Sequence, residues 1–322
     1  MPSQRPPRPA LTASAVALTL ALTACSQSGG GDSGGEPPIG AVPVLLESRT
    51  LAFPLASYAA DARQRGILAE AQDVLIDQCM QRYGFRYPLR RKAGAVGKGD
   101  EGRRYGLSDA AEAARYGYTN LEVNSTPKPP EKQEASMGPN EKLVLYGLEA
   151  DPSKPVPMTQ EESEKSDVAT TVVGGQKVPA GGCLRESFLK LYAPSKDAVD
   201  IMVPQNFGFE GYSRSQEDSR VRKAIKAWSD CMGKHGYTVD SPMDSQKQLG
   251  LNDTNLGSPQ AIATAKLDVD CKKQTNLVGI WYTVETAYQK RLIEQNAETL
   301  DRAKKQLDER MRLAASLIAA GS

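Results

Sequence analysis

The chain has one histidine and few aromatic residues, which limits the chemistry it can perform. His235 is the only histidine, and Phe, Trp and Tyr make up 6% of the 322 residues. A serine-hydrolase triad could take its base only from His235, which precedes Gly236 at a predicted helix end and is better explained as a capping or solvent-facing side chain. The Gly-rich residues 29–35 precede neither a strand nor a Lys-Ser/Thr pair, as a phosphate-binding loop would. We predict a protein that is not an enzyme, with no catalytic residue, cofactor or metal.

The chain also lacks an excess of either charge. Its 40 Lys and Arg residues and 39 Asp and Glu residues leave a formal net charge of +1. Nucleic-acid binding depends on clustered Lys and Arg side chains that displace counterions from phosphates. We therefore expect no nucleic-acid partner.

The first 24 residues have the order of a secretory signal peptide. Two arginines precede an apolar run at residues 11–22, which is too short to span a bilayer permanently. The run ends in Leu22-Thr23-Ala24-Cys25, which resembles the lipobox of bacterial lipoproteins. The resemblance implies cleavage before Cys25, lipidation of its thiol and anchoring by acyl chains such as palmitate. An ordinary signal peptide with a coincidental Cys25 is the alternative. We expect an extracytoplasmic protein held on the outer face of the cytoplasmic membrane by this lipid.

Four cysteines remain beyond the anchor: Cys79, Cys183, Cys231 and Cys271. An even number in an oxidising compartment predicts two disulfides, for which three pairings are possible. A zinc site is the competing interpretation. It is weaker because no C-x-x-C pair occurs and the chain has a single histidine.

Several stretches are poor in large apolar residues. Residues 26–47 consist mostly of Ser, Gly, Pro and small apolar residues, which predicts a flexible tether. Residues 93–103, 124–140 and 151–182 bury too little apolar surface to offset the entropy of ordering, so we predict poorly ordered loops there. The third contains an apolar island at residues 170–173, which predicts a short strand.

Helical periodicity dominates the rest. Residues 61–83 end before Gly84 and place on one side Leu68, Ala71, Leu75, Ile76 and Cys79. Residues 216–235 end before Gly236 and place on one side Val221, Ala224, Ile225, Trp228 and Cys231. Shorter helices are predicted at residues 109–116, 141–148 and 184–192, and further helix from residue 259 with at most a break near Asn276. Strands and helices do not alternate regularly along the sequence, which argues against a doubly wound α/β fold.

Two short motifs occur twice in the same order. Cys79-Met80-Gln81-Arg82-Tyr83-Gly84-Phe85 aligns with Cys231-Met232-Gly233-Lys234-His235-Gly236-Tyr237, and residues 103–109 align with residues 247–253. Each copy then reaches one more Cys. The simplest pairing is therefore Cys79–Cys183 with Cys231–Cys271, although Cys79–Cys271 with Cys183–Cys231 has the same pseudo-symmetry. We expect Trp228, Phe85 and Tyr237 to pack beside these cysteines.

The Cys-Met-x-x-x-Gly-aromatic element, residues 106–118 and the lipobox together resemble a group of exported actinobacterial (Streptomyces-type) lipoproteins. The group has no assigned activity to transfer. The resemblance therefore implies export, disulfides and helical content, but no function.

The C-terminal residues have a heptad-like apolar seam, formed by Ile293, Ala297, Leu300, Lys304, Leu307, Met311, Ala314 and Ile318. Such a seam can dock on a partner helix or pack on the chain's own body. We favour the chain's own body, because Lys304 weakens the coiled-coil interpretation.

Together these patterns predict a mainly α, disulfide-braced helical bundle of two related units with long poorly ordered loops. The predicted divisions are residues 1–24 (signal peptide), 25–48 (lipidated Cys25 and tether), 49–193 (first unit) and 194–322 (second unit with a long C-terminal helix). We expect a non-catalytic binding or structural role at the cell envelope, with the membrane and an envelope protein or cell-wall component as partners. The alternative is a solute-binding lipoprotein that delivers a small ligand to a transporter, a class that would need two α/β lobes.

Overall fold

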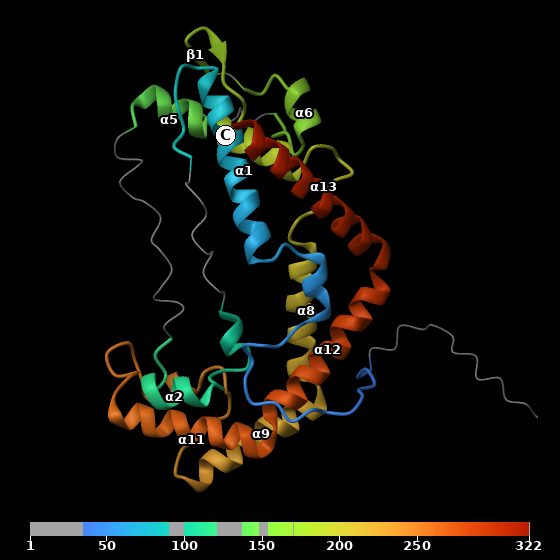
Figure 1. Ribbon diagram of the computed structural model, residues 1–322. Coiled ribbons are helices and arrows are strands. Elements are labelled where there is room, and N and C mark those ends of the chain that lie inside the picture. Colours follow the sequence, from blue (N-terminus) through green and yellow to red (C-terminus); the bar gives the residue numbers. More distant parts are fainter. Residues whose placement is uncertain (1–34, 90–99, 121–136, 148–153, 170, 322) are drawn as a thin grey trace, which may run out of the picture. The chain divides into compact units, whose positions relative to one another are not determined.

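The computed structural model describes residues 35–89, 100–120, 137–147, 154–169 and 171–321, and this part of the chain is mainly helical, as predicted (Figure 1). In chain order the elements are η1 (Pro54–Tyr58), α1 (Ala62–Gln81), η2 (Asp100–Arg103), α2 (Ala110–Tyr116), α5 (Pro139–Tyr146), α6 (Gln160–Lys165), β1 (Val172–Val173), β2 (Gln176–Lys177), α7 (Gly182–Tyr192), α8 (Val203–Glu217), α9 (Ser219–Lys234), α10 (Ser245–Gln248), α11 (Pro259–Thr275), α12 (Leu277–Gln295) and α13 (Ala297–Gly321). Within the described residues, β1 and β2 form a single antiparallel hairpin. The short strand predicted at residues 170–173 is thus confirmed as β1.

The duplicated helix ends have the same backbone geometry. α1 is followed by Gly84 with φ of +80°, and α9 by Gly236 with φ of +86°, a conformation that favours glycine. In each copy the amide of the next aromatic residue donates back to the carbonyl of the repeated methionine. These bonds join Phe85 to Met80 at 3.1 Å and Tyr237 to Met232 at 3.2 Å.

Several helical details differ from the prediction, and α8 was not predicted. The helix predicted at residues 216–235 begins at Ser219, because Asp218 ends α8 and caps α9. The C-terminal helical region breaks twice, at Asn276 in the left-handed conformation and again at Asn296. Residues 151–182, predicted as a loop, contain α6, which is capped by Thr159, and the β1–β2 hairpin.

Both disulfides follow the pairing within each copy of the motif. Cys79 is bonded to Cys183 and Cys231 to Cys271, so the swapped pairing and the zinc interpretation were wrong. Trp228 is fully buried in the core that contains the second disulfide, and Tyr237 packs at its edge. Phe85 packs in the same way against the core around the first disulfide.

The two predicted units exchange helices. α13 follows α12 in sequence but packs along α1 and α7, which belong to the first unit (Figure 1). Its seam residues Leu300, Leu307 and Ala314 are buried, so the predicted packing of the seam on the chain's own body is confirmed. α2 comes from the first unit but packs along α11. The described elements accordingly belong to one compact unit, residues 36–322.

Residues 36–53, here called the strap, correct part of the tether prediction. The Glu36 carboxylate accepts hydrogen bonds from the Ser219 amide at 2.5 Å and the Ser219 hydroxyl at 2.8 Å. Farther along, the Asn276 side chain accepts from Leu45 N at 3.2 Å and donates to Pro43 O at 3.0 Å. Groups distant in sequence thus supply the hydrogen bonds that hold residues 36–47. Residues 26–34 of the predicted tether, like Cys25, lie outside the described residues.

Among the described helices, none combines the length and the apolar composition needed to cross a bilayer.

Candidate functional site

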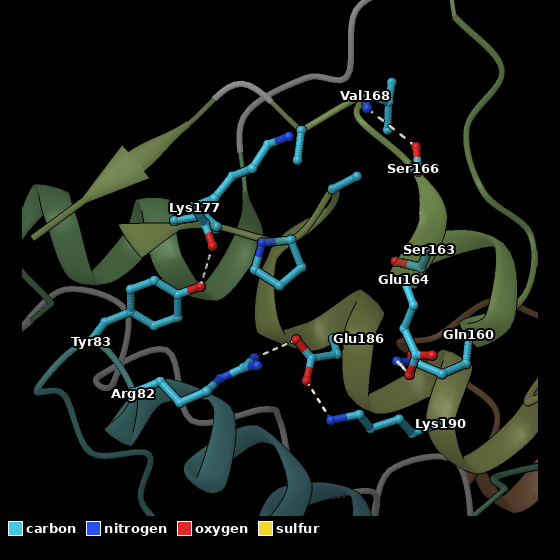
Figure 2. A pocket seen from close by; sticks show the side chains of 14 residues that line it. Arg82, Tyr83, Gln160, Ser163, Glu164, Ser166, Val168, Lys177, Glu186 and Lys190 are labelled. Carbon is cyan, nitrogen blue, oxygen red and sulfur yellow. Dashed lines mark hydrogen bonds and ion pairs between the residues drawn. The ribbon is translucent and has the colours of Figure 1, made fainter. Parts of the chain in front are cut away.

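A polar cavity lies next to the end of α1 (Figure 2). It is close to the Cys79–Cys183 disulfide, because the Arg82 guanidinium that lines it is 2.9 Å from Cys79 Sγ. It has a volume of about 370 Å³ and is bounded by the end of α1, by α6, by the segment around β2 and by α7. Charged and hydrogen-bonding side chains line it, namely Arg82, Tyr83, Gln160, Ser163, Glu164, Ser166, Lys177, Glu186 and Lys190. We call this space the polar cavity.

Glu186 is the central charge of the polar cavity. Its carboxylate forms an ion pair with the Arg82 guanidinium and a second with the Lys190 ammonium at 2.6 Å (Figure 2). The Glu186 side chain is 7% exposed, whereas those of Arg82 and Lys190 are 46% and 39% exposed. A buried carboxylate therefore positions two cations whose remaining donors face accessible space.

The same contacts set the protonation state of Glu186. Burial alone would raise the pKa of its carboxyl, but hydrogen bonds and charges from Lys190 and Arg82 outweigh burial and hold the pKa below its ordinary value. Glu186 is thus ionised at neutral pH. An efficient general acid or base needs a pKa near the working pH, so this carboxylate is better suited to fixing cations than to proton transfer.

Tyr83 holds the hairpin at one side of the polar cavity. Its hydroxyl donates to the Lys177 carbonyl oxygen at 2.7 Å (Figure 2). Burial raises the pKa of Tyr83, with Arg82 opposing the shift, so the hydroxyl keeps its proton and remains a donor. Two residues at the end of α1 therefore shape the polar cavity. Arg82 pairs with Glu186, and Tyr83 holds the hairpin.

The second disulfide has a related but uncharged arrangement. Glu186 lies three residues after Cys183, and Gln274 lies three residues after Cys271. The Gln274 Oε1 atom is 4.0 Å from Cys231 Sγ. The repeat therefore extends to the second cysteine of each pair, but only the first copy has a carboxylate there. Gln274 is a natural comparison for the role of Glu186.

The ion pairs outside the polar cavity include two whose carboxylates are fully buried, Lys272–Asp268 and Arg104–Glu285. In the first, Asp268 accepts from Lys272 Nζ at 3.0 Å, Trp228 Nε1 at 2.8 Å and the Tyr118 hydroxyl at 3.0 Å. Lys272 also donates to the Leu107 carbonyl oxygen at 2.7 Å. Both charges are fully buried and their polar partners come from three segments, so this network joins α9 and α11 to the chain around α2.

The second of these ion pairs joins Arg104 to Glu285. Arg104 donates through Nε to the Glu285 carboxylate at 2.9 Å, and the Tyr105 hydroxyl donates to the same carboxylate at 2.8 Å. Glu285 is fully buried on α12. Its neighbour Gln289 donates to it at 2.8 Å and accepts from Leu55 N at 3.2 Å. The Glu285 carboxylate thus has all of these partners within the fold, which indicates a structural role.

His235 was the one base that the sequence offered for a hydrolase triad. His235 is exposed at the end of α9 and does not line the polar cavity. Within the described ranges, no group of three or more His, Cys, Asp or Glu side chains is placed to hold a metal ion. Sequence reasoning also missed Arg82 and Glu186, whose only signal was their common spacing from the paired cysteines.

Comparison with family models, with curated proteins and with solved structures found no match to this chain.

Proposed function

We propose that this protein is a lipid-anchored extracytoplasmic lipoprotein with a non-catalytic binding role at the cell envelope, and that it holds a polar envelope component in the polar cavity. The observation that carries the proposal is the Arg82–Glu186–Lys190 cluster. Its two cations are held in place beside a disulfide and keep donors available to a ligand. The lowered pKa of Glu186 supports binding over proton transfer.

The position of the strap implies that a lipid on Cys25 would lie close to the folded part of the chain. Glu36 is hydrogen-bonded to the start of α9, and it follows Cys25 by 36 − 25 = 11 residues. At about 3.6 Å for each residue, a chain of that length spans no more than about 40 Å in any conformation. A lipid on Cys25 would therefore keep the start of α9 within that distance of the bilayer surface.

The alternative of a solute-binding lipoprotein finds less support. It depends on two α/β lobes, whereas the strands among the described residues make up one two-stranded hairpin. We therefore retain the binding role and propose no transporter.

The proposal is tested by photo-crosslinking in intact cells. A photoreactive residue at Glu164, which is exposed and lines the polar cavity, should give one reproducible adduct that mass spectrometry identifies as an envelope component. The same residue at Lys226, exposed on α9, is the matched control and should not give that adduct. Adding Lys190→Glu should reduce the yield at Glu164 several-fold. Equal adducts from both positions, or none from Glu164, would contradict binding at the polar cavity.

A further inference from the structure

A second cavity has a different chemical character. It has a volume of about 320 Å³ and lies between the chain around η1, α1, the end of α7, residues 199–205 and α13. Its lining is mainly apolar or aromatic and includes Tyr58, Leu68, Tyr192, Val199, Ala303 and Leu307. We call this space the apolar cavity. Its volume is within the range of small-molecule sites, which are mostly apolar with a few placed polar groups.

The edge of the apolar cavity is also apolar. Ile201 and Met202 line it, and they are 38% and 40% exposed. Exposed large apolar side chains are ordinary when scattered singly, but these two are adjacent and border a cavity. An apolar ligand could thus continue from the interior across this edge.

Arg310 supplies a cation without an acidic partner. Its Nε donates to the Leu191 carbonyl oxygen at 3.1 Å, and its guanidinium lies 5.0 Å from the centre of the Tyr192 ring. No carboxylate of the described residues forms an ion pair with it. Burial lowers the pKa of Arg310, with Tyr192 opposing the shift, which reflects a cation partly removed from water.

A purely structural role accounts for only part of this side chain. Capping the end of α7 uses Nε, and stacking on Tyr192 uses one face of the guanidinium. The two terminal nitrogens carry four further N–H donors, in a planar fork that matches a carboxylate. They have no hydrogen-bond acceptor in the described part of the chain.

Two further charges line the apolar cavity. Arg65 donates through one terminal nitrogen to the Ala60 carbonyl oxygen at 2.8 Å, and Asp200 accepts from the Met202 amide at 2.8 Å. The two arginines and one aspartate leave the lining with a formal excess of one positive charge. A ligand with one negative charge would balance it.

We propose that the apolar cavity binds a monoanionic amphiphile of the fatty-acid class, with its carboxylate on Arg310 and its alkyl chain among Leu68, Leu307 and Val199. A carboxylate gives the guanidinium its missing counter-charge, and the alkyl chain covers apolar surface now bordered by water. This inference concerns a different cavity from the proposed function, and its test does not depend on the lipid anchor.

The test is titration calorimetry of the full chain carrying Cys25→Ala with dodecanoate below its micellar concentration. We expect saturable binding of one molecule. Arg310→Met retains the packing of the alkyl stem but removes the charge, and should weaken binding at least tenfold. Arg312→Met on the same helix changes an exposed arginine and is the matched control, expected to leave the affinity unchanged. Dodecanol, with the same alkyl chain and no charge, should bind at least tenfold more weakly than dodecanoate.

A second variant separates binding from folding. Met202→Glu places a negative charge at the exposed edge, next to the start of α8, where an acidic side chain favours the helix. It should therefore weaken dodecanoate binding several-fold without lowering thermal stability. Absence of saturable binding to the unsubstituted cavity, equal affinity for dodecanol, or unchanged affinity in both Arg310→Met and Met202→Glu would overturn the proposal.

Discussion

Asp268→Asn is expected to lower the free energy of unfolding by about 3–5 kcal/mol, because it leaves the buried Lys272 ammonium without a counter-charge. The carboxylate now accepts from Lys272, Trp228 and Tyr118, and all four side chains are at most 1% exposed. An asparagine of similar size has one acceptor oxygen and no charge, so it cannot replace these interactions. Urea unfolding of the purified variant measures the loss.

Two controls identify the unpaired charge as the cause. Asp270→Asn changes an exposed carboxylate on the same helix and should alter stability by no more than about 0.5 kcal/mol. Adding Lys272→Met to Asp268→Asn removes the unpaired charge and should restore part of the stability. A loss from Asp268→Asn no larger than that from Asp270→Asn would contradict this account of the network.

The variant should also respond to pH in a defined direction. Burial lowers the pKa of Lys272, and the Asp268 carboxylate opposes that shift, so removing the carboxylate lowers the pKa further. The unfolded chain then keeps the lysine proton to higher pH than the folded protein. The free energy of unfolding of Asp268→Asn should therefore rise with pH as the solution approaches about pH 10.4, the ordinary lysine pKa.

Removing the Cys79–Cys183 disulfide is expected to have the other large effect. Its cysteines are 104 residues apart and those of Cys231–Cys271 are 40 apart. The chain-entropy model gives a loss of about 4.7 kcal/mol for the first and about 3.9 kcal/mol for the second. Guanidinium unfolding of the two double Cys→Ala variants should therefore rank the first as less stable.

A peptide map without reductant provides the check on connectivity. It should yield the two crosslinked peptides and no free thiol at Cys79, Cys183, Cys231 or Cys271. A Cys79→Ala/Cys183→Ala protein that unfolds at the same guanidinium concentration as the unmodified chain would contradict the bracing role.

The helices that sequence predicted have local signals. In α1 the apolar spacing, the Asp61 cap and Gly84 indicate the same segment, and the observed bounds differ from the prediction by at most two residues. α8 has no such signal, because Gly208 and Gly211 lower its helical propensity. Packing against α12 stabilises this helix despite its low propensity. Gly211 lies against Gln289 of α12, and the Ser215 hydroxyl accepts from the Trp281 indole at 2.9 Å.

The strap and the helix exchange were beyond sequence reasoning for a related reason. Residues 36–47 form hydrogen bonds with residues such as Ser219 and Asn276, about 180 to 230 residues away. The sequence pattern of this Pro-rich segment does not indicate hydrogen-bond partners so far away in the chain. α2 likewise has a predictable helical pattern, but nothing in that pattern indicates that it packs on α11.

The candidate sites were the least predictable part. The sequence located the paired cysteines. Arg82 and Glu186 each lie three residues after one of them, and this common spacing was the only sequence signal for the charged residues of the polar cavity. Arg310 has no comparable signal, because in sequence it is one of several charged residues in a long amphipathic helix. Its difference from Arg312 arises only when the Leu191 carbonyl and the Tyr192 ring are packed against it.

The central claim, a lipid-anchored envelope protein, depends on the chemical state of Cys25. Mass spectrometry of the N-terminal peptide from isolated membranes tests it most directly. We predict a peptide that begins at Cys25 and carries a diacylglyceryl group on the thiol. A peptide that continues through Ala24 into the leader, or an unmodified Cys25 thiol in the protein recovered from membranes, would contradict the claim.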